Sequence, residues 1–182
     1  VFLRPAWPPT SGCVGGAWAA LMHRWGKLTL DARVFPAAAL AMDRPNPRNA
    51  LGTALLSSAT ACADISDGLA QDLGHILERS GVDADVLWDA VPKHPALAAL
   101  SQEQQVEAAM SGGDDYELVF TAPADKRGLI EQASISALTP VTRIGRIVEK
   151  KPSGAPLAIR DASGRPLFLP VQGFDHFAQS AD

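Results

Sequence analysis

The sequence has few cysteines, no surplus of basic residues and no long apolar stretch, and each shortage excludes a class of protein. Two cysteines, Cys13 and Cys62, are too few for the disulfide framework of a small secreted domain. Both stand among small apolar residues, so we expect them to be buried. The formal net charge of -4 leaves no basic surface for a nucleic-acid backbone. No apolar run approaches the roughly 18 residues of a membrane span, and no secretory leader is apparent. We therefore expect a cytoplasmic protein that binds neither nucleic acid nor membrane.

What the sequence does contain is typical of one folded domain. It has 182 residues, of which 47% are hydrophobic and 20% are charged. This length supports a substantial core, and this composition is too apolar for wholesale disorder. We expect residues 1–182 to form a single domain without an internal repeat or linker.

Helical and strand patterns alternate along the chain. Trp18, Leu21, Met22 and Trp25 recur at steps of three and four residues, which predicts a helix with these side chains on its buried face. The other predicted elements are a helix at 50–55, a buried strand at 59–63, a helix at 69–81, a strand centred on 86–88, a short helix at 101–111, a strand at 116–123, a helix at 124–134, a strand at 139–150 and a hairpin turn at 161–164. Because hairpins join the alternation only late in the chain, we expect an α+β fold in which helices pack on a mixed β-sheet.

The segment "DISDG" joins the predicted strand at 59–63 to the helix at 69–81. Ser66 or Asp67 can cap the first helical turn, and capping alone explains most such segments. Capping does not require Asp64, which ends the strand three residues before Asp67. Two carboxylates beside a helix N-terminus can instead hold Mg²⁺ together with a phosphate group. Both interpretations stay open at this point.

A second junction of glycines and acids occurs in "SGGDDYELVF". Gly112 and Gly113 precede the pair Asp114 and Asp115, and Glu117 follows at the start of a strand. A polar turn entering a strand is the simpler explanation, since aspartates are common in turns. Two such junctions in one domain nevertheless favour a functional site.

Three further groups carry weaker signals. Arg143 and Arg146 stand three apart in a predicted strand and so point to opposite faces, as solvated charges commonly do. "GFDHF" holds Phe174, and a terminal aromatic cluster usually closes a core. No pair of histidines has the spacing of zinc ligands, so we do not expect a transition-metal site.

In order and separation, "DISDGLAQDLGHILERSG", "GGDDYELVFTAP", "TPVTRIGRI" and "GFDHF" resemble the C-terminal domain of thiamine-monophosphate kinases, from about Arg44 to Phe177. The resemblance implies the α+β C-terminal-domain fold of the aminoimidazole-ribonucleotide synthetase superfamily. It also implies transfer of the ATP γ-phosphoryl group to thiamine phosphate with Mg²⁺, which gives thiamine diphosphate. Phosphoryl transfer mainly needs positioning and cations that neutralise developing charge, which suits carboxylates that hold Mg²⁺.

The resemblance also implies roles for individual residues. These are Mg²⁺ ligation by Asp64 and Asp67, nucleotide contact by Ser66, nucleotide contact by Arg4, and substrate contact by Glu117 and Phe174. Residues 1–40 depart from the family pattern, with Gly16 where the family has an aspartate, and we expect them to be a divergent remnant. The resemblance implies that the family's N-terminal ATP-binding domain supplies further Mg²⁺ ligands and much of a homodimer interface, and we expect this domain to be absent.

Three functional hypotheses follow. The first is that the chain is the C-terminal part of a thiamine-monophosphate kinase, with little activity on its own because half of the metal site is missing. The second is a non-catalytic remnant that binds a nucleotide weakly or serves as an interaction module. The third, another synthetase of the same superfamily, ranks lowest because it would need a different segment in place of "GGDDYELVF".

Overall fold

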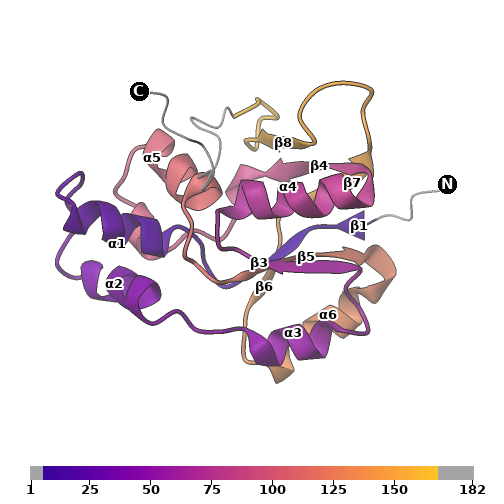
Figure 1. Ribbon diagram of the computed structural model, residues 1–182, viewed down its shortest axis with the longest axis horizontal. Helices are drawn as coiled ribbons and strands as arrows, with labels where there is room; N and C mark the ends of the chain where they lie inside the picture. Colours follow the sequence, from indigo (N-terminus) through magenta and orange to yellow (C-terminus); the bar gives the residue numbers. More distant parts are fainter. Residues whose placement is uncertain (1–5, 168–182) are drawn as a thin grey trace, which may run out of the picture.

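The structure is a computed structural model that describes residues 6–167, and it consists of two β-sheets with helices packed against them (Figure 1). In the first sheet, β5 (Leu118–Pro123) is the central strand, with β3 (Ala61–Asp64) antiparallel along one edge. Along its other edge lie β1 (Ala6–Trp7) and β2 (Pro9–Ser11), and β2 also pairs with β6 (Val141–Arg143).

The second sheet places β4 (Val82–Leu87) between β7 (Gly145–Glu149) and β8 (Leu157–Arg160). β4 is antiparallel to β7 and parallel to β8. The expected α+β class with a mixed sheet is therefore confirmed.

Helices cover both faces of the first sheet. α3 (Asn49–Leu55) and α6 (Arg127–Ser136) pack together on one side, and α4 (Leu69–Ser80) lies on the other side next to the second sheet (Figure 1). α1 (Gly16–Arg24), α2 (Phe35–Asp43) and α5 (Gln102–Val106) complete the helices. A π-helical turn, Glu107–Ser111, extends α5, and single 3₁₀ turns lie at Trp88–Ala90, Pro95–Leu97 and Ala124–Lys126. No helix within residues 6–167 is both long and apolar enough to cross a membrane.

Because β5 is covered on both faces, its alternate side chains enter two separate cores. Val119 joins the larger core around α4, whereas Phe120 and Ala122 join the smaller core beneath α3 and α6. The strand is therefore buried throughout its centre. This central position fixes the loop just before β5, which carries the second junction of glycines and acids.

The buried face of α1 was predicted wrongly. The helix buries its small residues, Gly16, Ala17, Ala19 and Ala20. Of the predicted stripe, Trp18 is half-buried against the larger core, whereas Trp25, just past the helix, is 59% exposed. Small side chains allow α1 to pack closely against its neighbours in the larger core. Residues 6–40, expected to be a divergent remnant, supply β1, β2, α1 and part of α2.

Two other predictions, the burial of the strand at 59–63 and the single strand at 139–150, fail because of where these strands lie in the sheets. The predicted buried strand at 59–63 is the edge strand β3, where Cys62 and Asp64 are exposed. Both cysteines are exposed rather than buried. The single strand predicted at 139–150 divides at Ile144 into β6 and β7, which belong to different sheets.

Candidate functional site

The two junctions of glycines and acids lie side by side, joined by backbone hydrogen bonds. The N–H of Ile65 donates to the carbonyl of Glu117 at 2.7 Å, and the N–H of Tyr116 donates back to the carbonyl of Ile65 at 2.9 Å. The N–H of Asp114 donates to the carbonyl of Ser66 at 3.0 Å. A Cβ at Gly113 would overlap that same Ser66 oxygen, so the contact requires glycine.

The loop before α4 is capped differently from the prediction. Neither Ser66 nor Asp67 caps the helix with its side chain, and Gly68, at φ +115°, holds the capping position. Instead, the Asp72 carboxylate accepts the N–H groups of Ser66 at 3.0 Å and of Asp67 at 3.1 Å. Burial raises the pKa of Asp72 against these two hydrogen bonds, and the nearby charges of Asp67 and Asp64 raise it further. The side chains of Ser66 and Asp67 thus take no part in capping α4.

Asp64 and Asp67 form the edge of the site. Asp64 is exposed at the end of β3, and Asp67 accepts one hydrogen bond from Gln71 Nε2 at 3.1 Å. Within residues 6–167 no lysine, arginine or histidine forms an ion pair with either. The pKa of the Tyr116 phenol is raised chiefly by the charge of Asp114, and the charges of Asp64 and Asp67 add to this shift as they do to that of Asp72. The carboxylates therefore share one region of negative potential.

This donor set fits Mg²⁺. Magnesium prefers oxygen ligands and is commonly held by one or two carboxylates together with substrate phosphates. Across residues 6–167 no group of three or more acidic, histidine or cysteine side chains is arranged to hold a metal ion. The two loop carboxylates alone would thus form an incomplete cage, which phosphate oxygens could complete.

A cavity of about 610 Å³ opens beside this edge. Arg48, Asp64 and Tyr116 provide its polar and aromatic walls, and Leu56 and Leu118 provide apolar surface. Tyr116 is 39% exposed and has φ 49°, a conformation that residues other than glycine seldom adopt. Backbone strain of this kind concentrates at functional sites. Another cavity, of about 660 Å³ near Trp7, is lined by Val141 and Arg143 of the motif "TPVTRIGRI" but by no residue of the two acidic loops.

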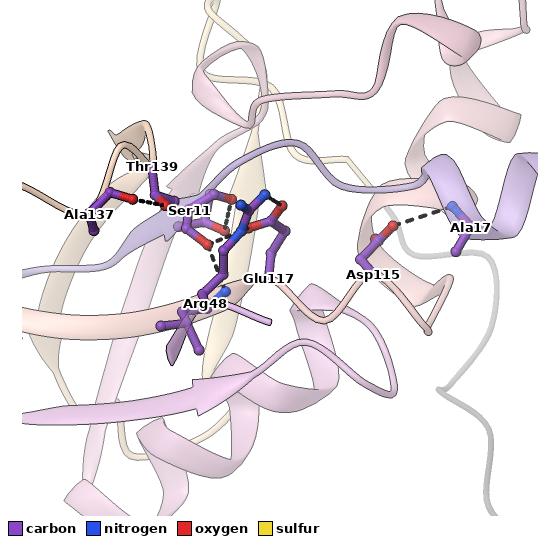
Figure 2. A network of polar contacts seen from close by, with 9 residues as sticks. Ser11, Ala17, Arg48, Asp115, Glu117, Ala137 and Thr139 are labelled. Atoms are coloured by element: carbon purple, nitrogen blue, oxygen red, sulfur yellow. Dashed lines mark hydrogen bonds and ion pairs between the residues drawn. The ribbon is translucent and has the colours of Figure 1, made fainter. Parts of the chain in front are cut away.

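Glu117 is buried and is held in a network of polar contacts with Arg48, which lines this cavity, and Ser11 (Figure 2). Arg48 donates to its carboxylate twice, from Nε to Oε2 at 2.7 Å and from Nη2 to Oε1 at 2.5 Å. The Ser11 hydroxyl donates to Oε2 at 2.5 Å and accepts the N–H of Leu118 at 2.8 Å. Gly12 leaves room for the network, because a Cβ there would overlap the Glu117 carboxylate.

The neighbouring Asp115 joins the same loop to α1 (Figure 2). Its carboxylate accepts the N–H groups of Gly15 at 2.6 Å and of Ala17 at 3.4 Å, at the N-terminus of that helix. Burial dominates its titration and raises its pKa to about 7, although these hydrogen bonds act in the opposite direction. Asp115 therefore links the Glu117 loop to the amino-terminal segment.

The structure thus brings Asp64, Ser66, Asp67 and Glu117 into one region. Arg4 and Phe174, the two other residues implied by the resemblance, lie outside the described residues. Arg146 lies in the second sheet, where it pairs with Asp85 at 2.8 Å. Sequence reasoning missed Ser11 and Arg48 as partners of Glu117, and its only hint was that Arg48 follows two prolines at the start of a predicted helix.

Comparison with known proteins supports the resemblance drawn from the motifs. Residues 6–156 match the family described as AIR synthase related protein, C-terminal domain. The thiamine-monophosphate kinase of Haemophilus influenzae is 42% identical over 139 residues, which cover 75% of this chain and 42% of the relative. That of Escherichia coli K12 is 40% identical over 136 residues, which cover 74% of this chain and 41% of the relative. The chain thus spans about two fifths of the length of these curated relatives.

Solved structures give the same result for the fold. Thiamine-monophosphate kinase from Stenotrophomonas maltophilia K279a superposes with a TM-score of 0.76 at 37% identity, covering 86% of this chain and 51% of that one. AaThiL complexed with AMPPCP and TMP gives 0.73 at 25% identity, covering 96% of this chain and 52% of that one. Escherichia coli HypE gives 0.62 at 17% identity, a similarity of fold alone.

Proposed function

The chain belongs to the family of AIR synthase related protein C-terminal domains, and we propose that it is the C-terminal part of a thiamine-monophosphate kinase. The reaction is Mg²⁺-dependent transfer of the γ-phosphoryl group of ATP to thiamine phosphate. The observation that carries this proposal is the junction of the two motif loops, which gathers Asp64 and Asp67 without a cationic partner in residues 6–167 beside a 610 Å³ cavity.

The nucleotide side of the site is assigned to the loop before α4. Asp64 and Asp67 would hold Mg²⁺, which when bound neutralises charge on the transferring phosphoryl group. Ser66 would contact the nucleotide with its hydroxyl, which does not cap α4. Asp72 serves this site by fixing the loop backbone while its own carboxylate is occupied.

The acceptor side is assigned to the cavity and the loop that ends at Glu117. The cavity is of a size that suits a small organic substrate, and its mixture of apolar and polar walls is typical of such sites. Tyr116 and Leu118 offer surface for a ring system, whereas Arg48 and Asp64 lie at the polar walls. The AaThiL structure, complexed with AMPPCP and TMP, supports a nucleotide and a thiamine phosphate as the two ligands.

The isolated chain should have little or no kinase activity. It spans about two fifths of its curated relatives, and its two loop carboxylates make only part of a metal site. Robust turnover of ATP and thiamine phosphate by the purified chain would refute this half-site proposal. Homodimerisation of full-length relatives and a cytoplasmic location remain predictions.

The test is a calorimetric titration of the 182-residue chain with Mg²⁺–ATP, alongside Asp67→Asn and the control Asp125→Asn. Asp125 is exposed on the 3₁₀ turn before α6, away from the loops. We expect Asp67→Asn to weaken binding by roughly tenfold or more, a scale typical of changes at metal sites, and Asp125→Asn to leave it unchanged. Equal affinities for all three proteins would remove Asp67 from the site. A complete lack of heat would instead support the non-catalytic interaction module.

A further inference from the structure

Arg48 stands between Glu117 and the cavity, and it is the member of this pair that a ligand would meet. The Arg48 side chain lines the cavity and is 18% exposed, whereas that of Glu117 is 8% exposed. Both oxygens of Glu117 already accept hydrogen bonds, Oε1 from Arg48 and Oε2 from Arg48 and Ser11. A ligand could reach Glu117 directly only by displacing one of these partners.

The guanidinium of Arg48 retains donors for a ligand. The ion pair uses Nε and Nη2, so the group meets the carboxylate along one edge. Nη1, which carries two N–H donors, has no hydrogen-bond partner among residues 6–167. It is also not sealed in the interior, since no buried side-chain nitrogen or oxygen in this part of the chain lacks a partner. The unused edge therefore lies where solvent or a ligand can reach it.

The ion pair prepares Arg48 for recognition in advance. A free arginine loses considerable rotamer freedom when it binds a ligand, whereas a guanidinium already fixed by two hydrogen bonds loses less. The anchor is itself rigid, because Ser11 joins Glu117 to the N–H of Leu118 in the central strand. The planar donors of arginine match phosphate oxygens better than the point charge of lysine does.

We propose that Arg48 recognises the phosphate monoester of the acceptor substrate and that Glu117 acts through Arg48 as a positioning residue. This inference rests on the proposed kinase function and refines the substrate contact that the family resemblance assigns to Glu117. Asp64 lines the same cavity. A phosphate bound by Arg48 therefore lies in the same cavity as a carboxylate assigned to Mg²⁺. Phosphoryl transfer requires the acceptor oxygen of this phosphate to be near the metal.

The test compares the affinity of the full 182-residue chain for thiamine phosphate and for thiamine, at constant Mg²⁺. Tyr116 is the only tyrosine of the chain and lines the cavity. Fluorine-labelled tyrosine therefore gives a single ¹⁹F resonance that reports occupancy of this cavity. The variants are Arg48→Lys, Glu117→Gln and the pair Arg48→Met with Glu117→Gln. The pair avoids leaving a buried carboxylate without its cation, and urea unfolding verifies that each variant folds.

We expect the natural chain to bind thiamine phosphate at least tenfold more tightly than thiamine. This is roughly the gain in affinity that hydrogen bonds to a charged group provide. The paired variant should bind both ligands within about twofold, because it loses the phosphate contact but not the rest of the cavity. Arg48→Lys should keep part of the preference. Glu117→Gln should also reduce the preference for thiamine phosphate, although the guanidinium of Arg48 remains. If Arg48 were positioned independently of Glu117, this variant would keep the full preference.

The outcomes separate this inference from the proposed function. Equal binding of both ligands by the natural chain, or an unchanged preference in the paired variant, overturns the role of Arg48 and leaves the kinase proposal standing. Arg48-dependent binding of phenyl phosphate as tight as that of thiamine phosphate supports phosphate recognition but contradicts thiamine specificity. If neither thiamine ligand shifts the Tyr116 resonance, the acceptor site proposed for this chain is refuted and the role of Arg48 is refuted with it.

Discussion

The buried carboxylate of Asp115 should make the stability of this domain depend on pH in an unusual direction. Its folded-state pKa is raised from 3.8 to about 7, chiefly by burial, and Asp115 as a whole is only 9% exposed. A raised pKa means that the folded protein holds the proton more tightly than the unfolded chain does. Stability from this group is therefore complete below about pH 4 and is lost as the pH rises to about 7.

The size of the effect follows from the shift. A difference of about three pKa units corresponds to about 4 kcal/mol at 1.36 kcal/mol per unit. Asp115→Asn removes the titration and keeps a side-chain oxygen that can accept the N–H of Gly15. The free energy of unfolding of the natural protein minus that of the variant should fall by about 4 kcal/mol between pH 4 and 7 and then level off.

Urea unfolding followed by tryptophan fluorescence, at intervals of half a pH unit from 4 to 8.5, measures this difference. Trp88 is 4% exposed and provides a buried reporter. The matched control is Asp114→Asn, since Asp114 is the adjacent aspartate and is exposed. Its difference curve should be flat. A flat or rising curve for Asp115→Asn would show that the hydrogen bonds at the N-terminus of α1 outweigh burial, contrary to this reasoning.

Three further predictions concern the loops and their surroundings. Ser11→Ala should lower the free energy of unfolding by about 1–3 kcal/mol, because the partly buried N–H of Leu118 loses its acceptor; an unchanged urea midpoint would contradict this. Gly113→Ala should lower it by more than about 2 kcal/mol, because the new Cβ overlaps the Ser66 oxygen. Thermal unfolding measures this loss, and hydrogen exchange should show faster opening of the Asp114 amide. Gly128→Ala, in α6, should instead stabilise by about 0.5–1 kcal/mol, since nothing lies within 4 Å of the added methyl group; a lower melting temperature would refute this.

Local sequence patterns predicted the elements whose limits depend on the backbone itself. α4 runs from Leu69 to Ser80 and ends at Gly81, which has φ 65°, as its glycine stop indicated. The short helix after residue 101 begins with a capping box formed by Ser101 and Gln104. Helix periodicity and glycine stops act over a few residues and can therefore be seen in the sequence.

The side of an element that becomes buried could not be seen in the same way. The tryptophan stripe of α1 and the apolar edge strand β3 both suggested burial, yet Trp25 and Cys62 are exposed. Apolar spacing identifies a face, but which face is covered depends on the neighbours that the fold supplies. The small residues of α1 were the better indicator, because they permit close packing.

The sequence by itself determined the α+β class, most of the helices and strands, and the two acidic loops with the family they resemble. Only the tertiary structure decided that these loops touch, that Gly68 holds the capping position while Asp72 fixes the loop before it, and that Glu117 is bound by Arg48 and Ser11. The physical reason is separation along the chain. Arg48 lies 69 positions from Glu117 and Ser11 lies 106 positions away. Residues so far apart are brought together by strand pairing and sheet packing, which no local periodicity encodes.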